Sequence, residues 1–518
     1  MKQTKRIIVL LLVGLTITVQ SQNLADTDKS NIKDRDYPSD YWMDVVTEQP
    51  EGYVMDEQGN VTISSAEGLA WFAAVVNGRN GQEANDFEGK EVKLVSDIDM
   101  GAHLWEAIGN SYFDDSISYE YVQKYFKGSF DGGKYEISNL THGYRGYYRR
   151  LDQFGGYDKC QGMFGNLVNA SVTNLHINDF VCLNDLEDDL HFGSAAAVAE
   201  ESVIDRCYSK GSLYPEDHFF GDKGIPAGGI AYRSLNSRIS DCVFVADSCI
   251  SIQMGGIVHD NFTTNENHRA EVTNCYVFGR IIDYVSDPLK IGYSAGIVHA
   301  NKADSGIDKG SIVKNCYYYP VSPGNDMVGH RKAIACSNYT GCTIENCYYL
   351  AVPNLNFYSG VCGENGGSVR DTSAFNCIDN RCVLENPVEI GGEMVDDLKE
   401  ALNHWVAMQQ NSADYENWCD DVWMEQGGAP LLCAVYEAAE ENHEELGRIT
   451  LSPNPTSGFV RIEGATATEV RVYNALGQLV KTAQNTNEVN LRGLPQGVYL
   501  LRITDEDGAS ATKKLVVR

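Results

Sequence analysis

Short apolar runs recur at a nearly constant interval between residues 128 and 349, with polar turn residues between them. Each run contains a phrase in which Asn, Asp or Arg stands directly before one small apolar position. Aligned on that position, the repeats place these residues in register: Leu140, Leu175, Cys207, Cys242, Cys275, Cys316 and Cys347. The spacings are 35, 32, 35, 33, 41 and 31 residues, which is the range of a repeat array. The pattern therefore predicts a solenoid.

A second phrase precedes the aligned position in several repeats. It reads GGIAY, GGIVH, AGIVH and KAIAC from Gly228, Gly255, Ala295 and Lys332. Two β-rich runs per repeat with tight turns between them indicate coils that pair their backbones along one axis. The sequence thus predicts an all-β protein built on a right-handed parallel β-helix over residues 61–392. Asn suits the corner before the aligned position because it tolerates a left-handed backbone, and it stands there at 139, 174, 274, 315 and 346.

Helical patterns flank the repeats and predict short caps. A capping box at Ser64 and Glu67 begins a helix with apolar residues at helical spacing, and Asn77-Gly78 ends it. Residues 91–100 alternate as in a strand. Residues 394–409 predict a second helix, which places on one face Val395, Leu398, Leu402, Trp405 and Val406. Together with Trp418 and Trp423, this helix predicts a cap over residues 393–436 that covers the open edge of the last coil.

The two ends of the chain differ from the repeats. Residues 1–22 place basic residues before an apolar run too short to span a bilayer, as in a secretory signal peptide. Residues 23–60 predict a leader segment with little structure of its own. Residues 437–447 form an acidic linker, and the alternating strands of residues 448–518 predict a small immunoglobulin-like β-sandwich. No transmembrane segment is expected after removal of the signal.

The net negative charge of the chain limits the kinds of partner that it is expected to bind. A formal charge of −31, from 72 acidic and 41 basic residues, argues against nucleic acid, which is usually held by a basic surface. No cofactor is expected, although the acidity leaves calcium open. The candidate run is Asp26-Thr-Asp28-Lys-Ser30, which lacks the Gly and terminal Glu of an EF-hand and is read more simply as leader. The absence of any C-x2-C pair argues against a zinc site.

Fifteen Cys in an exported chain would ordinarily indicate disulfides. Five of them occupy the aligned repeat position, where each side chain would stack on its equivalent in the next coil. An interior ladder of small thiols is therefore favoured over a chain of disulfides. The off-register pairs Cys377/Cys382 and Cys419/Cys433 are the better disulfide candidates.

The C-terminal segment carries several motifs in a fixed order. They are SPNPTSG from Ser452, VYNALGQ from Val472, LPQGVY from Leu494 and KKLVV from Lys513. In these phrases the segment resembles the C-terminal sorting domain of the type IX secretion system of Bacteroidota. The resemblance implies the type IX secretion machinery as partner, an outer-surface or secreted location, and cleavage of the domain on export. The sorting-motif residues are Pro453, Asn454, Pro455, Gly458, Gly477, Gly497 and Tyr499.

The repeats show a second resemblance. The phrases WEAIG, FKGSFDGGKYEISNL and GMFGNLVNASVTNL are similar to the GLUG motifs of bacterial surface proteins, and the likeness covers roughly residues 61–350. Some proteins of that group carry a peptidase with the zinc motif H-E-x-x-H. Here His443-Glu444 is followed by Glu-Leu-Gly, so the second His is missing and peptidase activity is not expected.

Two aromatic-rich insertions, residues 111–126 and 141–159, interrupt the compact repeats. The second also contains a basic cluster in an otherwise acidic chain. Rings stack on sugar faces and guanidinium groups bind carboxylates, although such rings can also simply pack their own loops. The candidate ligand contacts are Tyr121, Tyr125, Tyr144, Arg145, Tyr147 and Arg149.

These features favour a non-enzymatic, adhesin-like or glycan-binding surface protein, with a surface glycan or a host protein as ligand. A β-helix polysaccharide lyase or glycoside hydrolase is the alternative, and a purely structural surface component is a second. No catalytic residue is assigned, because the paired carboxylates of so acidic a chain arise freely. His259 and His299 recur at equivalent places and are interpreted as corner residues of the repeat rather than as a proton shuttle.

Overall fold

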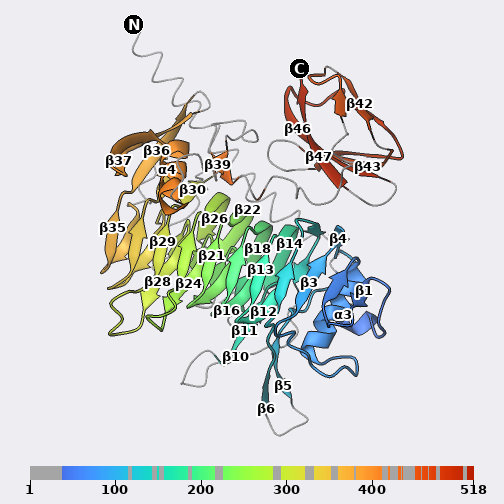
Figure 1. Cartoon of the computed structure of the whole chain (residues 1–518), viewed down its shortest axis with the longest axis horizontal. Helices are drawn as coiled ribbons and strands as arrows, with labels where there is room; N and C mark the ends of the chain where they lie inside the picture. The colour runs from blue at the N-terminus through green and yellow to red at the C-terminus, as the bar shows by residue number, and fades with distance from the viewer. Residues whose placement is uncertain are drawn as a thin grey trace. The chain divides into compact units, whose positions relative to one another are not determined.

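The computed structural model describes the following residues: 38–114, 120–142, 149–150, 157–184, 190–215, 226–251, 253–283, 293–320, 332–351, 360–378, 381–410, 418–419, 430–432, 435, 450–456, 458–464, 466–473, 479–505 and 510–518. The structure is mostly β and contains parallel sheets. It divides into two compact units, residues 1–372 and 373–518 (Figure 1).

In the described part of the first unit, most strands belong to four large sheets, which we number in the order in which the chain enters them. Sheet I contains β1 Tyr53–Met55, β2 Val61–Ile63, β3 Glu91–Leu94, β7 Ser129–Asp131, β13 Ser171–Thr173, β17 Val203–Asp205, β21 Arg238–Ser240, β25 Glu271–Thr273, β29 Ile312–Lys314, β32 Thr343–Glu345 and β35 Ser368–Arg370. Sheet II contains β4 Ile98–Asp99, β8 Glu136–Ser138, β14 His176–Asn184 with β9 Thr141–His142 beside it, β18 Tyr208–Pro215, β22 Val243–Ser251, β26 Tyr276–Asp283, β30 Tyr317–Pro320 and β33 Tyr348–Leu350.

The other two sheets have shorter strands. Sheet III contains β10 Arg149–Arg150, β11 Tyr157–Gln161, β15 Leu190–Gly193, β19 Pro226–Gly228, β23 Gln253–Gly255 and β27 Tyr293–Ala295. Sheet IV contains β12 Phe164–Val168, β16 Ala196–Glu200, β20 Ala231–Leu235, β24 Val258–Thr263, β28 Val298–Ala303, β31 Ala335–Asn338 and β34 Cys362–Asn365. A separate hairpin joins β5 Ser111–Asp114 to β6 Glu120–Gln123.

The chain passes through the sheets in a repeating order. From β16 it continues through β17, β18 and β19, one strand in each of the four sheets, and then returns as β20, which pairs in parallel with β16. Successive circuits therefore lie on one another as coils, and Figure 1 shows their strands side by side from β3 to β35. We call residues 53–370 the coil stack. The repeat predicted from the sequence corresponds to one coil.

The aligned repeat position lies inside the coil stack. All seven side chains at that position are at most 1% exposed, and its five Cys are free thiols. Each ladder thiol approaches a backbone carbonyl, as Cys275 Sγ approaches Thr273 O at 3.1 Å. The predicted interior ladder is confirmed for these five Cys.

The ladder thiols should resist modification in the folded protein. Burial raises the pKa of the Cys207, Cys242, Cys275 and Cys316 thiols well above the ordinary value, and the thiolate is the reactive form. Alkylation followed by peptide mass mapping should find the ladder unlabelled in the native protein and labelled after unfolding. Partly exposed Cys362 serves as the internal control and should label faster. Disulfides between ladder positions would contradict this prediction.

Two rows of Asn follow the axis of the coil stack. The corner Asn residues at 139, 174, 274, 315 and 346 all have φ between 50° and 56°, so the predicted left-handed corner is confirmed. Asn315 Nδ2 donates to Asn274 Oδ1 at 2.7 Å. A second row lies on sheet IV, where the amides of Asn261, Asn301, Asn338 and Asn365 bond in series at 2.9 Å per step. The sequence analysis did not predict this second row.

The prediction that residues 23–60 have little structure of their own is wrong for the part that the structure describes, residues 38–60. In the described part of that segment, α2 Trp42–Val45 and β1 are present, and Trp42 and Tyr53 are at most 5% exposed. Apolar side chains in a segment that is polar on average account for this packing. The helix α3 Ala66–Asn77 matches the predicted helix, but it is buried almost all round.

The N-cap of α3 lies one residue later than the capping box predicted. Ser65 Oγ accepts from Gly68 N at 3.1 Å. The substitution Ser65→Ala should therefore lower the free energy of unfolding by about 1 kcal/mol, because it leaves a helix N–H without its acceptor. The matched control Ser64→Ala should change it much less. Chemical denaturation of both variants is the measurement, and a larger loss for Ser64→Ala would restore the predicted box.

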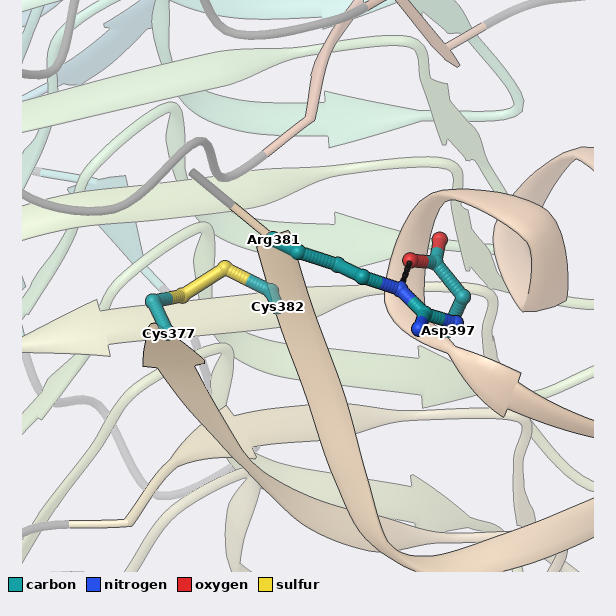
Figure 2. The surroundings of a disulfide bond; sticks show 4 residues. All are labelled: Cys377, Arg381, Cys382 and Asp397. Carbon is teal, nitrogen blue, oxygen red and sulfur yellow. Dashed lines mark hydrogen bonds and ion pairs between the residues drawn. A yellow bond between two sulfur atoms is a disulfide. The ribbon is translucent and has the colours of Figure 1, made fainter. Parts of the chain in front are cut away.

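The second unit begins with an antiparallel hairpin, β36 Ser373–Ile378 and β37 Arg381–Ile390. Cys377 and Cys382 form a disulfide across it, which confirms that predicted pair. Figure 2 shows this bond beside the Arg381–Asp397 ion pair, whose Nε and Oδ2 are 2.8 Å apart. The other predicted pair, Cys419/Cys433, lies partly outside the described residues.

The predicted helix over residues 394–409 begins later than expected. Residues 393–397 form strand β38 Glu393–Asp397, which pairs with β37, and α4 Leu398–Gln410 follows. Val395 is therefore buried from a strand, whereas Leu398, Leu402 and Val406 are buried from the helix. Asn403 holds β39 Trp418–Cys419, which pairs with β40 Leu431–Leu432, because its Nδ2 donates to Trp418 O at 2.8 Å.

The chain ends in two antiparallel sheets with their own core. One sheet contains β41 Thr450–Ser452, β42 Phe459–Glu463 and β45 Glu488–Asn490, and the other β44 Leu479–Gln484, β43 Ala467–Tyr473, β46 Gly497–Asp505 and β47 Ser510–Val517. Inward side chains of both sheets share one apolar cluster that includes Val460, Val472, Val489, Leu501 and Leu515. This arrangement is consistent with the two-sheet packing that the alternating pattern predicts.

Candidate functional site

The predicted ligand contacts lie mostly outside the described residues. Tyr144, Arg145 and Tyr147 fall outside them, and for Tyr121 and Arg149 only the backbone is described, in β6 and β10. Tyr125 is described: its side chain is partly buried, and its hydroxyl donates to Gln123 Oε1. The grouping of these six side chains therefore stays a prediction.

The backbone that leads into the two aromatic insertions is described and lies close together. Ile108, just before the first insertion, and Phe126, its last residue, both pair with β12, opposite Phe164 and Leu167. Trp105, just before the first insertion, pairs with His142, the last described residue before the gap in the second. Both insertions thus start from neighbouring coils at one end of the coil stack.

A pocket of about 890 Å³ lies at the same end. Its walls come from five separate segments of the chain, namely residues 38–42, 64–67, 97–102, 139–141 and 179–181. Trp42 is fixed in the wall because its Nε1 donates to Met100 O at 3.1 Å. The volume is in the range of small-molecule sites.

Carboxylates and hydroxyls dominate the polar lining of this pocket. Its acidic residues are Glu67, Asp97, Asp99 and Asp179. Asp99 Oδ1 accepts from Gly101 N at 3.0 Å and from Asn139 Nδ2 at 2.8 Å, and Asp97 Oδ1 accepts from Glu136 N at 2.9 Å. These bonds hold two carboxylates in place, and a carboxylate can accept several hydrogen bonds, including bonds from ligand hydroxyls. The pocket can therefore hold a polyhydroxylated ligand.

A second polar cluster lies on sheet IV and corrects the interpretation of the repeated His residues. His259 and His299 are not at corners but within β24 and β28, on the face opposite to core residues Val258 and Val298. Their rings stack at 4.2 Å between centroids, and the Tyr232 ring lies tilted against His259, with 4.9 Å between the centroids. Burial lowers the pKa of His259, so this ring is neutral near pH 7.

Asp260 sits at the centre of this cluster. Its Oδ1 lies 2.8 Å from Lys302 Nζ and 3.2 Å from His259 Nδ1, and its Oδ2 lies 3.3 Å from Arg233 Nη2. Burial alone would raise the pKa of this carboxyl, but His259, Lys302 and Arg233 outweigh that effect and hold the pKa well below its usual range. Asp260 is therefore ionised near neutral pH.

Sequence reasoning missed both the pocket and this cluster. The pocket gathers short segments that no repeat aligns. The cluster had a visible signal, since GGIVH and AGIVH place two His one repeat apart and adjacent coils bring equivalent positions together.

No helix in the described part of the chain is long and apolar enough to cross a membrane.

The described sorting-motif residues lie in turns and at strand ends of the C-terminal sheets, where several of them form hydrogen bonds. Asn454 Oδ1 accepts from Val516 N at 2.9 Å, and Tyr499 Oη donates to Pro495 O at 2.8 Å. The peptide bonds before Pro453 and Pro455 are cis. Gly458 precedes β42 and Gly497 begins β46, whereas Gly477 lies outside the described residues.

Comparison with known families identifies this segment. Residues 450–518 match the secretion system C-terminal sorting domain. This domain marks proteins that the type IX system exports, so the protein is delivered to the cell surface or the extracellular space and has the type IX machinery as a partner. No curated protein and no solved structure matches the chain.

Proposed function

We propose that the protein is a non-enzymatic, adhesin-like glycan-binding protein of the bacterial cell surface. In this proposal the coil stack is a right-handed parallel β-helix of the GLUG type from a member of the Bacteroidota. The parallel pairing of each strand with its equivalent one coil later supports the β-helix. Export by the type IX system supports the surface role.

The observation that carries the glycan-binding proposal is the position of the pocket. The pocket reaches Thr141, the first residue of the second aromatic insertion. It therefore combines fixed carboxylate and amide groups with the point at which a sequence rich in Tyr and Arg leaves the described chain. Sugars need both kinds of group, because their hydroxyls bond to planar polar side chains and their apolar faces stack on rings.

The loop contacts complete the proposed site. Tyr121, Tyr125, Tyr144, Arg145, Tyr147 and Arg149 belong to the two insertions, whose described flanks pair with each other at Trp105 and His142. Rings from neighbouring coils would extend the pocket along the stack. The guanidinium groups of Arg145 and Arg149 would favour a glycan with acidic groups.

A glycan array of the full-length mature protein tests the proposal. The triple variant Tyr144→Ala, Tyr147→Ala and Arg149→Ala should lose binding, and so should Asn139→Ala, which removes a donor from the pocket wall. The matched control is Tyr339→Ala, an exposed Tyr outside both insertions, which should bind as the parent does. Parent protein that binds no glycan on the array would refute the proposal.

The acids of the same pocket favour one alternative, a polysaccharide-degrading enzyme of the β-helix class. Paired carboxylates at a sugar site are the usual machinery of glycoside hydrolysis. Release of reducing ends or unsaturated products from polysaccharides would support this alternative, provided that Asp99→Asn abolishes the release. Binding without any cleavage supports the lectin-like function instead.

A further inference from the structure

His259, Asp260 and His299 bring three potential metal ligands together on β24 and β28. Each residue offers one donor atom, and the three atoms lie within 4.8 Å of one another. We propose that this cluster binds a single divalent transition-metal ion, for which zinc is the representative. The inference rests on different residues from the proposed glycan site and does not depend on it.

The donor set suits such an ion. Two imidazole nitrogens and one carboxylate oxygen are the ligands of many three-ligand zinc sites, which keep the fourth position open. His259 Nδ1 and Asp260 Oδ1 are 3.2 Å apart, close to the roughly 3.3 Å between two ligands of a tetrahedral ion with bonds of about 2.0 Å. The His299 ring, which is only partly buried, must turn from its stacked position to complete the set.

The polar atoms of the cluster are poorly satisfied without a ligand. Among the described residues, Nε2 of His259 and Nδ1 of His299 have no hydrogen-bond partner, and His259 Nδ1 meets only Asp260 Oδ1, at 3.2 Å. His259 is 5% exposed, so water does not replace the missing bonds. Buried polar atoms without partners are rare in native proteins and call for an explanation such as a bound ion. A bound metal ion would give these ring nitrogens a coordination bond in place of the missing hydrogen bonds.

Two cations already contact Asp260, and they define the site further. Lys302 Nζ lies 2.8 Å from Oδ1, where a metal ion would bind. Its side chain is 30% exposed and can turn into solvent when a divalent ion arrives. Arg233 instead contacts Oδ2 at 3.3 Å, so it can orient the carboxylate while Oδ1 binds the metal. Lys302 is therefore a built-in competitor for the site, and Arg233 is a positioning residue.

Zinc binding to the untagged full-length protein tests this inference, with a fluorescent chelator as competitor. We expect one zinc ion per chain. The isosteric Asp260→Asn and the partly exposed His299→Ala should each weaken binding at least about 100-fold, the upper range for loss of a group that only supports a ligand. Lys302→Ala should tighten binding about tenfold, because it removes a like charge from the site.

The control is His268→Ala, whose side chain is 57% exposed and lies on the surface near Glu201. It should bind zinc as the parent does. Circular dichroism and the unfolding transition of each variant establish that it folds, and Lys302→Ala alters only a partly exposed side chain. Failure of the parent to bind one equivalent of zinc, or equal affinity of Asp260→Asn and His268→Ala, would overturn the inference. Weaker binding by Lys302→Ala would do the same.

Discussion

Replacing Asn301 with leucine should lower the free energy of unfolding of the coil stack by about 3 to 5 kcal/mol, because a removed buried amide leaves several groups unpaired at 1 to 3 kcal/mol each. Asn301 is 0% exposed. Its Oδ1 accepts from Asn261 Nδ2, and its Nδ2 donates to Asn338 Oδ1 and to the carbonyl oxygens of Ser311 and Thr343. The amide thus ties three neighbouring coils together, and leucine fills the space but satisfies none of these partners.

Asn365→Leu is the matched control. Asn365 closes the same row, where it accepts from Asn338 Nδ2 at 2.9 Å, but its side chain is exposed. Water can replace the lost bond there, so the same substitution should cost less than about 1 kcal/mol. Urea denaturation of both variants, followed by circular dichroism, gives the two free energies. Equal losses at positions 301 and 365 would show that the row contributes no more than an exposed amide.

Removal of residues 448–518 should abolish delivery of the protein to the cell surface and medium. These residues contain the whole match to the sorting domain, and the type IX machinery acts on that domain. Fractionation of cells that express the full-length and truncated chains, with immunoblotting of each fraction, is the measurement. The truncated chain should accumulate inside the cell, whereas the full-length chain should reach the surface or the medium.

The truncation should leave the coil stack folded. The apolar cluster of the C-terminal sheets, from Val460 to Val517, shares no residue with the core of the coil stack. Loss of export can therefore be separated from misfolding by comparing protease resistance of the two chains. A truncated chain that still reaches the surface would contradict the assignment of the export signal to this domain.

The repetitive part of the fold was predictable from the sequence because each coil repeats the same pattern of buried positions and corner residues. A buried position such as Cys275 recurs after each circuit, and the Asn before it adopts a left-handed backbone that most residues avoid. These constraints act on neighbouring residues and so leave a signal at fixed spacing. The start of α4 was missed because Val395 serves equally well in a helical stripe and in a strand paired with β37.

The candidate sites were harder to predict because they depend on contacts between distant segments. The pocket joins Trp42 to Asp99 and Asn139, and nothing in the composition of residues 38–60 indicates that they fold against the first coils. His259 and Asp260 are adjacent in sequence, but Arg233 and Lys302 reach them only from the preceding and following coils. Such a cluster depends on which residues of neighbouring coils lie side by side. Because the repeat length varies from coil to coil, the sequence does not show this alignment directly.

The most direct test of the account is hydrogen exchange of the full-length protein with and without the oligosaccharide that binds best on the array. Protection should appear in peptides that cover the pocket walls, residues 38–42, 64–67, 97–102 and 139–141, and in both aromatic insertions. Peptides from β31 and β34, at the opposite end of the coil stack, should exchange as before. Protection confined to those distant peptides, or no protection at saturating ligand, would contradict a glycan site at the amino-terminal end.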